Sequence, residues 1–141
     1  MLAYLDSSVL LRKIFREDGE LATLPNFGPF VSSAVFEVEC FRTLYRAKIG
    51  SRISEEESVR KSDEIYQHLQ AMTRIRVTDI VLQTAKRPFT VSLGTLDAIH
   101  LATALLWKER KPGKIAFLTH DAKLASAARA EGFQVAGVEE L

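Results

Sequence analysis

The chain has 141 residues, of which 47% are hydrophobic, 26% charged and 9% aromatic. This composition excludes an intrinsically disordered chain, which would be much poorer in apolar residues. The formal net charge of +1 excludes a strongly basic domain that coats nucleic acid by electrostatics alone, but it allows a local basic strip. The single cysteine, Cys40, cannot form an internal disulfide, and its apolar setting predicts a buried helical thiol.

The start of the chain, "MLAYLDSSVLLRKIF", lacks the basic segment of a secretion signal and reaches Asp6 too early. No apolar run approaches the length that crosses a membrane. We therefore expect a cytoplasmic protein with no membrane partner.

Short apolar or β-branched runs alternate with helical patterns along the chain. In chain order we expect a strand at 2–5, a helix at 9–17, a short helix within 19–25, a strand at 29–32, helices at 34–49 and 54–72, a strand at 74–77, helices at 79–87 and 95–110, a strand at 115–119, a helix at 122–132 and a weaker strand within 133–138. Capping residues support the boundaries: Ser7 or Ser8 before the first helix, Ser54 with Glu57 at capping-box spacing, and Gly132 after the last helix.

Strands that alternate with helices predict a parallel sheet covered by helices on both faces, because parallel neighbours need crossover connections. The expected fold class is therefore α/β. The short turn at 50–52 predicts a helical hairpin at about 33–72. Neither a repeat nor a Pro/Gly-rich linker divides the sequence, so we expect a single domain over residues 1–141.

Three aspartates are expected at the edge of the sheet where ligands bind in open parallel folds, the carboxyl ends of the strands. Asp6 ends the first strand, Asp121 follows the fourth, and Asp97 lies in the first turn of its helix if Thr95 is the cap. Helix capping alone could explain any one of them, since a carboxylate there is stabilised by about 0.3 to 1 kcal/mol. Asp79 also opens a helix, and nothing further marks it as functional.

Asp97 differs because its helix has no clear polar face before Lys108. A buried carboxylate is costly unless it is paired, protonated or bound to a cation. If the three aspartates converge, their oxygens favour a hard divalent ion, Mg²⁺ or Mn²⁺. Such an ion typically serves phosphodiester hydrolysis by activating water and offsetting charge. The sequence has no P-loop, GxGxxG or HExxH motif that would favour nucleotide-binding or zinc-protease chemistry.

These residues lie in segments that resemble a known family over essentially the whole chain. The segments are "YLDSSVLL", "VSSAVFEVECFRTLYR", "LDAIHLATAL" and "LTHDAKLASAARAEGF". In this order and at these separations they resemble the PIN-domain ribonucleases, and among them the VapC-like toxins of toxin-antitoxin pairs.

The resemblance implies a three-layer α/β/α sandwich around a mainly parallel sheet of four to five strands. It also implies a Mg²⁺- or Mn²⁺-dependent endoribonuclease whose metal-binding and catalytic acids fall on Asp6, Glu39, Asp97 and Asp121. The Ser8 hydroxyl stands where the family commonly supports the metal site, which is compatible with a capping role. Thr119 stands where the family often has a threonine or a further acid, so we expect one tightly held ion rather than two.

Glu39 rests on the family spacing and not on the helical pattern. By periodicity it is expected to be solvated beside Arg42 and Thr43, whereas Glu37 shares an apolar face with Cys40 and is the stranger residue. Glu37 is therefore kept as the alternative second acid.

Cations that could contact RNA phosphates occur on two helices. They are Arg12, Lys13 and Arg16 on the helix expected at 9–17, and Arg42, Arg46, Lys48 and Arg52 on and just after the helix expected at 34–49. Arg42 and Arg46 are the favoured RNA contacts, although charges on outer helix faces are usually solvated. The aromatic residues Phe15, Tyr45 and Trp107 are expected in the core or an interface rather than stacked on bases.

The histidines are not needed as acid-base groups, because the ion activates the water. We expect His68 on the surface and His120 in a loop. His100 recurs at its place in the family pattern, and we expect it to be a buried, hydrogen-bonded residue rather than a metal ligand.

The resulting hypothesis is a toxin that hydrolyses RNA, forms a homodimer and is restrained by a cognate antitoxin. The alternative is a non-catalytic PIN-like module that binds RNA or protein, and the four acids count against it. A haloacid-dehalogenase-like phosphatase would need an aspartate two residues after Asp6, where Ser8 stands.

Overall fold

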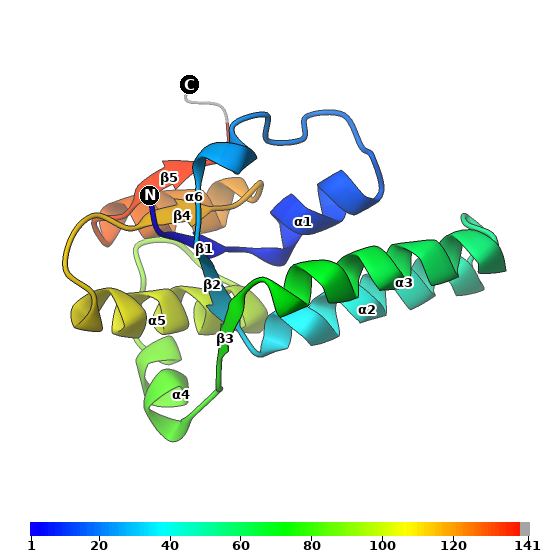
Figure 1. Cartoon of the computed structure of the whole chain (residues 1–141). Helices are drawn as coiled ribbons and strands as arrows, with labels where there is room; N and C mark the ends of the chain where they lie inside the picture. Colours follow the sequence, from blue (N-terminus) through cyan, green and yellow to red (C-terminus); the bar gives the residue numbers. More distant parts are fainter. Residues whose placement is uncertain (139–141) are drawn as a thin grey trace.

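A five-stranded, all-parallel sheet forms the centre of the computed structural model, which describes residues 1–138 (Figure 1). Residues 139–141 of the expected domain lie outside the described part. The strands are β1 (Ala3–Leu5), β2 (Phe30–Ser33), β3 (Thr73–Ile75), β4 (Ala116–Leu118) and β5 (Gln134–Ala136), in the spatial order β3-β2-β1-β4-β5. All the expected strands are therefore present, including the weak fifth one.

The helices follow the expected alternation with the strands. They are α1 (Ser7–Ile14), α2 (Val35–Ile49), α3 (Glu55–Gln70), α4 (Asp79–Ala85), α5 (Thr95–Arg110) and α6 (Ala122–Ala130). A 3₁₀ turn at Leu24–Asn26 overlaps only the end of the region 19–25, where a short helix is expected. Helix α3 has the expected cap, in which the Glu57 amide donates to Ser54 Oγ. Helix α4 ends two residues earlier than expected because Pro88 follows, and a residue before proline avoids helical geometry.

Two capping expectations are wrong. Helix α1 begins at Ser7, so Asp6 is its N-cap residue, and the Ser8 hydroxyl is used elsewhere. Helix α5 has Gly94 rather than Thr95 at its N-cap, although Asp97 still lies in the first turn. Helix α1 therefore begins two residues earlier than the expected 9–17, whereas α5 covers the expected residues 95–110, and the aspartates stay at the edge of the sheet.

The side chains of β1 alternate between two hydrophobic cores. Ala3 and Leu5 pack with residues of α1, α2 and α3 on one face, whereas Tyr4 packs with α5 and α6 on the other. Helix α4 packs against α5 outside this second layer. The α/β class and the three-layer α/β/α arrangement are confirmed.

Helices α2 and α3 form the expected hairpin and extend beyond the edge of the sheet (Figure 1). Their buried side chains continue the first core along the hairpin: Phe36, Cys40, Leu44, Ile65 and Leu69. Cys40 is buried as expected. Among residues 1–138, no helix is long and apolar enough to span a membrane.

Strand β1 is central, with β2 on one side and β4 on the other. The chain moves outward from β1 to β2 and β3, and later returns to add β4 and β5 on the opposite side. The carboxyl ends of β1 and β4 therefore flank a topological switch point, which is where open parallel sheets form their binding crevices.

Candidate active site

Asp6 follows β1 and is 4% exposed. Its Oδ2 atom accepts hydrogen bonds from Ser8 Oγ at 2.6 Å and from Thr119 Oγ1 at 2.8 Å. Ser8 Oγ in turn accepts from the His120 amide at 3.0 Å. The two hydroxyls therefore hold the Asp6 carboxylate through its Oδ2 atom. The other oxygen, Oδ1, lies 3.8 Å from His100 Nε2.

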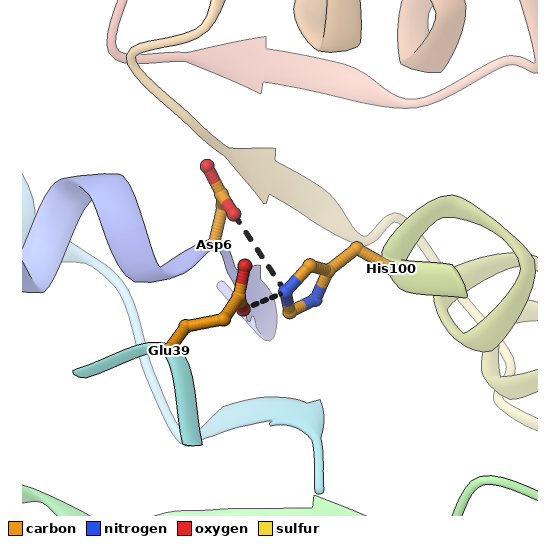
Figure 2. A group of neighbouring side chains, drawn as sticks. All are labelled: Asp6, Glu39 and His100. Atoms are coloured by element: carbon orange, nitrogen blue, oxygen red, sulfur yellow. Dashed lines mark hydrogen bonds and ion pairs between the residues drawn. The ribbon is translucent and has the colours of Figure 1, made fainter. Parts of the chain in front are cut away.

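The side chain of Glu39, on α2, points into the molecule toward His100 of α5. Its Oε1 atom is 2.5 Å from His100 Nε2, and its side chain is 17% exposed (Figure 2). The expectation that Glu39 is a solvated residue beside Arg42 is wrong. Helical periodicity considered only neighbours on α2, whereas the partner of Glu39 comes from another helix.

Glu37 points in a different direction. It forms an ion pair with Arg74 of β3, and both side chains are more than a third exposed. The apolar surroundings expected for Glu37 are therefore not found, and it takes no part in the cluster around Asp6.

His100 lies on α5 and is fully buried. Its Nδ1 atom is 2.7 Å from the Tyr4 hydroxyl, and its Nε2 atom bonds Glu39. Burial by itself disfavours the charged ring, but the hydrogen bond to Glu39 and the negative charges of Asp6, Glu39 and Asp97 outweigh it and raise the pKa of His100. The expected description of His100 as buried and hydrogen-bonded agrees with this geometry.

Asp97 lies one turn before His100 on α5, and residues three apart on a helix share a face. Burial, together with the negative charges of Asp6 and Asp121, raises the pKa of Asp97 to about 6, and His100 opposes the increase. The negative charges of Asp6 and Asp121 therefore disfavour the ionised form of Asp97.

Asp121 is the N-cap residue of α6. Its Oδ1 atom accepts from the Leu124 amide at 2.8 Å, and its own amide donates to Thr119 Oγ1 at 3.0 Å. Thr119 thus links the Asp121 backbone to the Asp6 carboxylate, which couples the ends of β4 and β1.

In the described part of the chain, Asp6, Glu39 and His100 form a group whose potential ligand atoms all lie within 4.8 Å of one another. Figure 2 shows these three side chains. Asp97 and Asp121 lie outside this group but act on it electrostatically. Clustered carboxylates repel one another, and a divalent cation removes that repulsion. Their oxygens are the donors that Mg²⁺ and Mn²⁺ prefer, so the residues present fit such an ion.

Comparison with known proteins identifies the family. The PIN domain family matches residues 3–130. The chain belongs to the PIN domain family. PIN domains are generally nucleases that use divalent metals, and the acidic cluster is compatible with that chemistry. No curated protein matches the chain.

A solved structure shares the fold over nearly the whole length of the chain. It is described as a toxin-antitoxin complex from Klebsiella pneumoniae, and the match covers 98% of this chain and 96% of that chain. The TM-score is 0.64 and the sequence identity is 17%. At this identity the likeness supports the fold.

Several other residues singled out from the sequence are not part of the group formed by Asp6, Glu39 and His100. Arg42 and Arg46 are exposed on α2, and they stay predictions as RNA contacts. Arg12 donates to the Gly19 carbonyl oxygen. Trp107 is buried as expected, whereas Tyr45 is exposed.

His68 is half-buried rather than a surface residue, and burial with the charge of Lys13 lowers its pKa. His120 lies between β4 and α6, and its Nδ1 is 2.6 Å from the Gly137 carbonyl oxygen.

Tyr4 is the residue that the sequence interpretation missed. It lies in the middle of β1 and is fully buried, and the sequence pattern predicts only an apolar strand at this position. A buried tyrosine usually needs a partner for its hydroxyl, and this rule is the signal that could have found it.

Proposed function

We propose that this PIN domain is a Mg²⁺- or Mn²⁺-dependent endoribonuclease that hydrolyses RNA phosphodiester bonds. The observation that supports the proposal is the group formed by Asp6, Glu39 and His100, together with the effect of the charges of Asp6, Asp121 and Glu39 on Asp97. A structural role explains a single acid at a helix start, but it does not explain why the charges of Asp6, Asp121 and Glu39 all act to raise the pKa of Asp97.

The protein contributes a rigid set of oxygen donors. Asp6 is held by Ser8 and Thr119, Glu39 is held by His100, and Asp97 is held in the first turn of α5. When bound, the divalent cation activates water and offsets the negative charge that develops on the phosphate. One tightly held ion is proposed, because Thr119 offers only a hydroxyl that already donates to Asp6.

The biological setting is proposed from similarity. The neighbour from Klebsiella pneumoniae is a toxin-antitoxin complex and matches almost the full chain. We therefore propose a VapC-like toxin of the cytoplasm that forms a homodimer and is restrained by a cognate antitoxin protein. The exposed Arg42 and Arg46 lie on the same helix as Glu39 and are the proposed contacts to RNA phosphates.

The test is incubation of the purified full chain with total cellular RNA, in Mg²⁺ or in EDTA, followed by gel analysis. The wild type is expected to cleave in Mg²⁺ only, and Asp6→Asn is expected to be inactive. Asp79→Asn is the matched control, because Asp79 also opens a helix, α4, but is not among the charges that raise the pKa of Asp97; it is expected to cleave normally.

Cleavage that persists in EDTA or in Asp6→Asn would contradict the proposed site. Binding of RNA without cleavage, measured by electrophoretic mobility, would favour the alternative of a non-catalytic RNA-binding module.

A further inference from the structure

A row of three hydrogen-bonded side chains connects the core to the acidic cluster. The Tyr4 hydroxyl of β1 is 2.7 Å from His100 Nδ1, and His100 Nε2 of α5 is 2.5 Å from Glu39 Oε1 of α2. Tyr4 and His100 are both fully buried. The row therefore joins three elements that are distant in the sequence, and it ends at a proposed ligand of the cation.

The donor and the acceptor of the hydrogen bond between His100 and Glu39 are fixed. An ionised carboxylate only accepts hydrogen bonds, so His100 Nε2 is the donor. In the neutral ring the other nitrogen, Nδ1, accepts from the Tyr4 hydroxyl; in the charged ring it donates to the Tyr4 oxygen. Nε2 faces Glu39 as a donor in both states. One oxygen of Glu39 is thereby held, and the other is left for a further partner.

The geometry disfavours a direct bond between His100 and the cation. The His100 Nε2 atom is hydrogen-bonded to Glu39 Oε1. A ring nitrogen that donates its proton to a carboxylate has no free lone pair for a cation. Mg²⁺ and Mn²⁺ also prefer oxygen to an imidazole nitrogen.

Packing alone does not require the polar atoms of the row. The Tyr4 ring stacks on Phe117, with ring centres 5.1 Å apart and nearly parallel planes, and it meets the His100 ring edge-on. A phenylalanine would make the same ring contacts. Buried polar groups are costly unless they are bonded, so the hydroxyl and the imidazole need a reason beyond filling space.

We propose that His100, oriented by Tyr4, is a positioning residue that fixes the Glu39 carboxylate for binding of the divalent cation. The proposal rests on the proposed function of the acidic site. It predicts that the row controls the affinity for the cation and leaves binding of RNA largely unchanged. Tyr4 acts only through His100, and His100 acts only through Glu39.

The first test measures Mn²⁺ affinity of the full chain without RNA, from the electron paramagnetic resonance signal of free Mn²⁺. Loss of a residue that orients a metal ligand typically weakens affinity by about 10- to 100-fold. His100→Leu is expected in that range, and Tyr4→Phe is expected near its lower end. His100→Gln is expected to recover much of the affinity, because its amide nitrogen can donate to Glu39.

Leu101→Val is the matched control, because Leu101 is the next residue on α5 and is equally buried. It changes the core without altering the row, and its Mn²⁺ affinity is expected to equal that of the wild type. An equal loss in Leu101→Val and His100→Leu would overturn the proposal by showing a general effect on the fold.

The second test asks whether His100 acts through Glu39. In a Glu39→Gln background, His100→Leu is expected to cause no further loss of Mn²⁺ affinity. A full additional loss would overturn the proposal. Nitrogen NMR of the His100 ring with saturating Mg²⁺ gives an independent readout: Nε2 is expected to stay protonated, and replacement of its proton by the ion would show a direct ligand instead.

These outcomes are separate from those of the nuclease test. If the wild type binds Mn²⁺ and the variants weaken as expected, the positioning role stands even when no RNA is cleaved. If the wild type cleaves RNA and His100→Leu binds Mn²⁺ normally, the nuclease proposal stands and the positioning role fails. A wild type that binds no Mn²⁺ overturns both.

Discussion

The two glutamates on α2 show how neighbouring residues acquire different roles. Glu39 is bonded to a buried histidine of α5, whereas Glu37 makes a solvent-exposed ion pair with Arg74. Exposed ion pairs of this kind contribute about 0 to 1 kcal/mol. Glu39 is therefore a proposed metal ligand, whereas Glu37, two positions earlier on the same helix, contributes little to stability.

Substituting each glutamate by glutamine tests this division. Glu39→Gln is expected to lower the rate of RNA cleavage by about 100-fold, the effect typical of removing one group that stabilises transition-state charge. Glu37→Gln is the matched control and is expected to cleave at close to the wild-type rate. The measurement is the initial rate on one defined RNA, and the reverse pattern would make Glu37 the second acid.

At the scale of elements, the backbone that follows β5 lies close to Thr119, which follows β4. The Thr119 amide donates to the Ala136 carbonyl oxygen. Gly137 then passes so close that an added Cβ would lie 2.2 Å from the Thr119 carbonyl oxygen. Thr119 also donates to Asp6, so the path of β5 helps to determine where that carboxylate is held.

Gly137→Ala is expected to displace Thr119 and to destabilise the protein. Gly113→Ala is the matched control, because both glycines have a positive φ but nothing lies within 4 Å of an added Cβ at Gly113. Backbone strain alone costs about 1 to 2 kcal/mol, and a clash in a packed region adds about 1 to 3 kcal/mol. Urea unfolding measures the difference, and equal losses in both variants would show that the close approach is unimportant.

Particular elements also show how far the sequence alone leads. The alternation of short apolar runs with capped helices was enough to predict the five strands and the order of helices. Asp6 and Asp121 could be placed because they follow strands directly. Glu39 and Tyr4 could not be placed by periodicity, since their shared partner comes from α5 and the approach of α2, β1 and α5 is a property of the assembled fold.

For the molecule as a whole, the charge of Asp97 links the site to global stability. Its pKa is about 6 in the folded protein, compared with 3.8 for an ordinary aspartate. The folded state therefore binds more protons than the unfolded chain between about pH 4 and pH 6. In the metal-free protein, the contribution of Asp97 to the free energy of unfolding therefore decreases as the pH rises through this window.

Asp97→Asn is expected to remove this decrease. In EDTA at pH 7 the variant is expected to be more stable than the wild type by about 1 to 3 kcal/mol, a range that allows for solvent screening at a half-buried position. Saturating Mg²⁺ is expected to reduce this difference in the free energy of unfolding, because it stabilises only the wild type. Chemical unfolding at pH 4 to 7 gives the comparison, and a destabilised variant at pH 7 would contradict the prediction.

The central place of β1 also has a consequence for synthesis of the chain on the ribosome. β1 pairs with β4, and the Asp6 amide donates to the Leu118 carbonyl oxygen. A nascent chain that ends before β4 carries Asp6, Glu39 and Asp97, but it lacks the strand and the Thr119 hydroxyl that hold Asp6 in place. The site of the proposed nuclease is therefore assembled only after β4 and Thr119 have emerged from the ribosome.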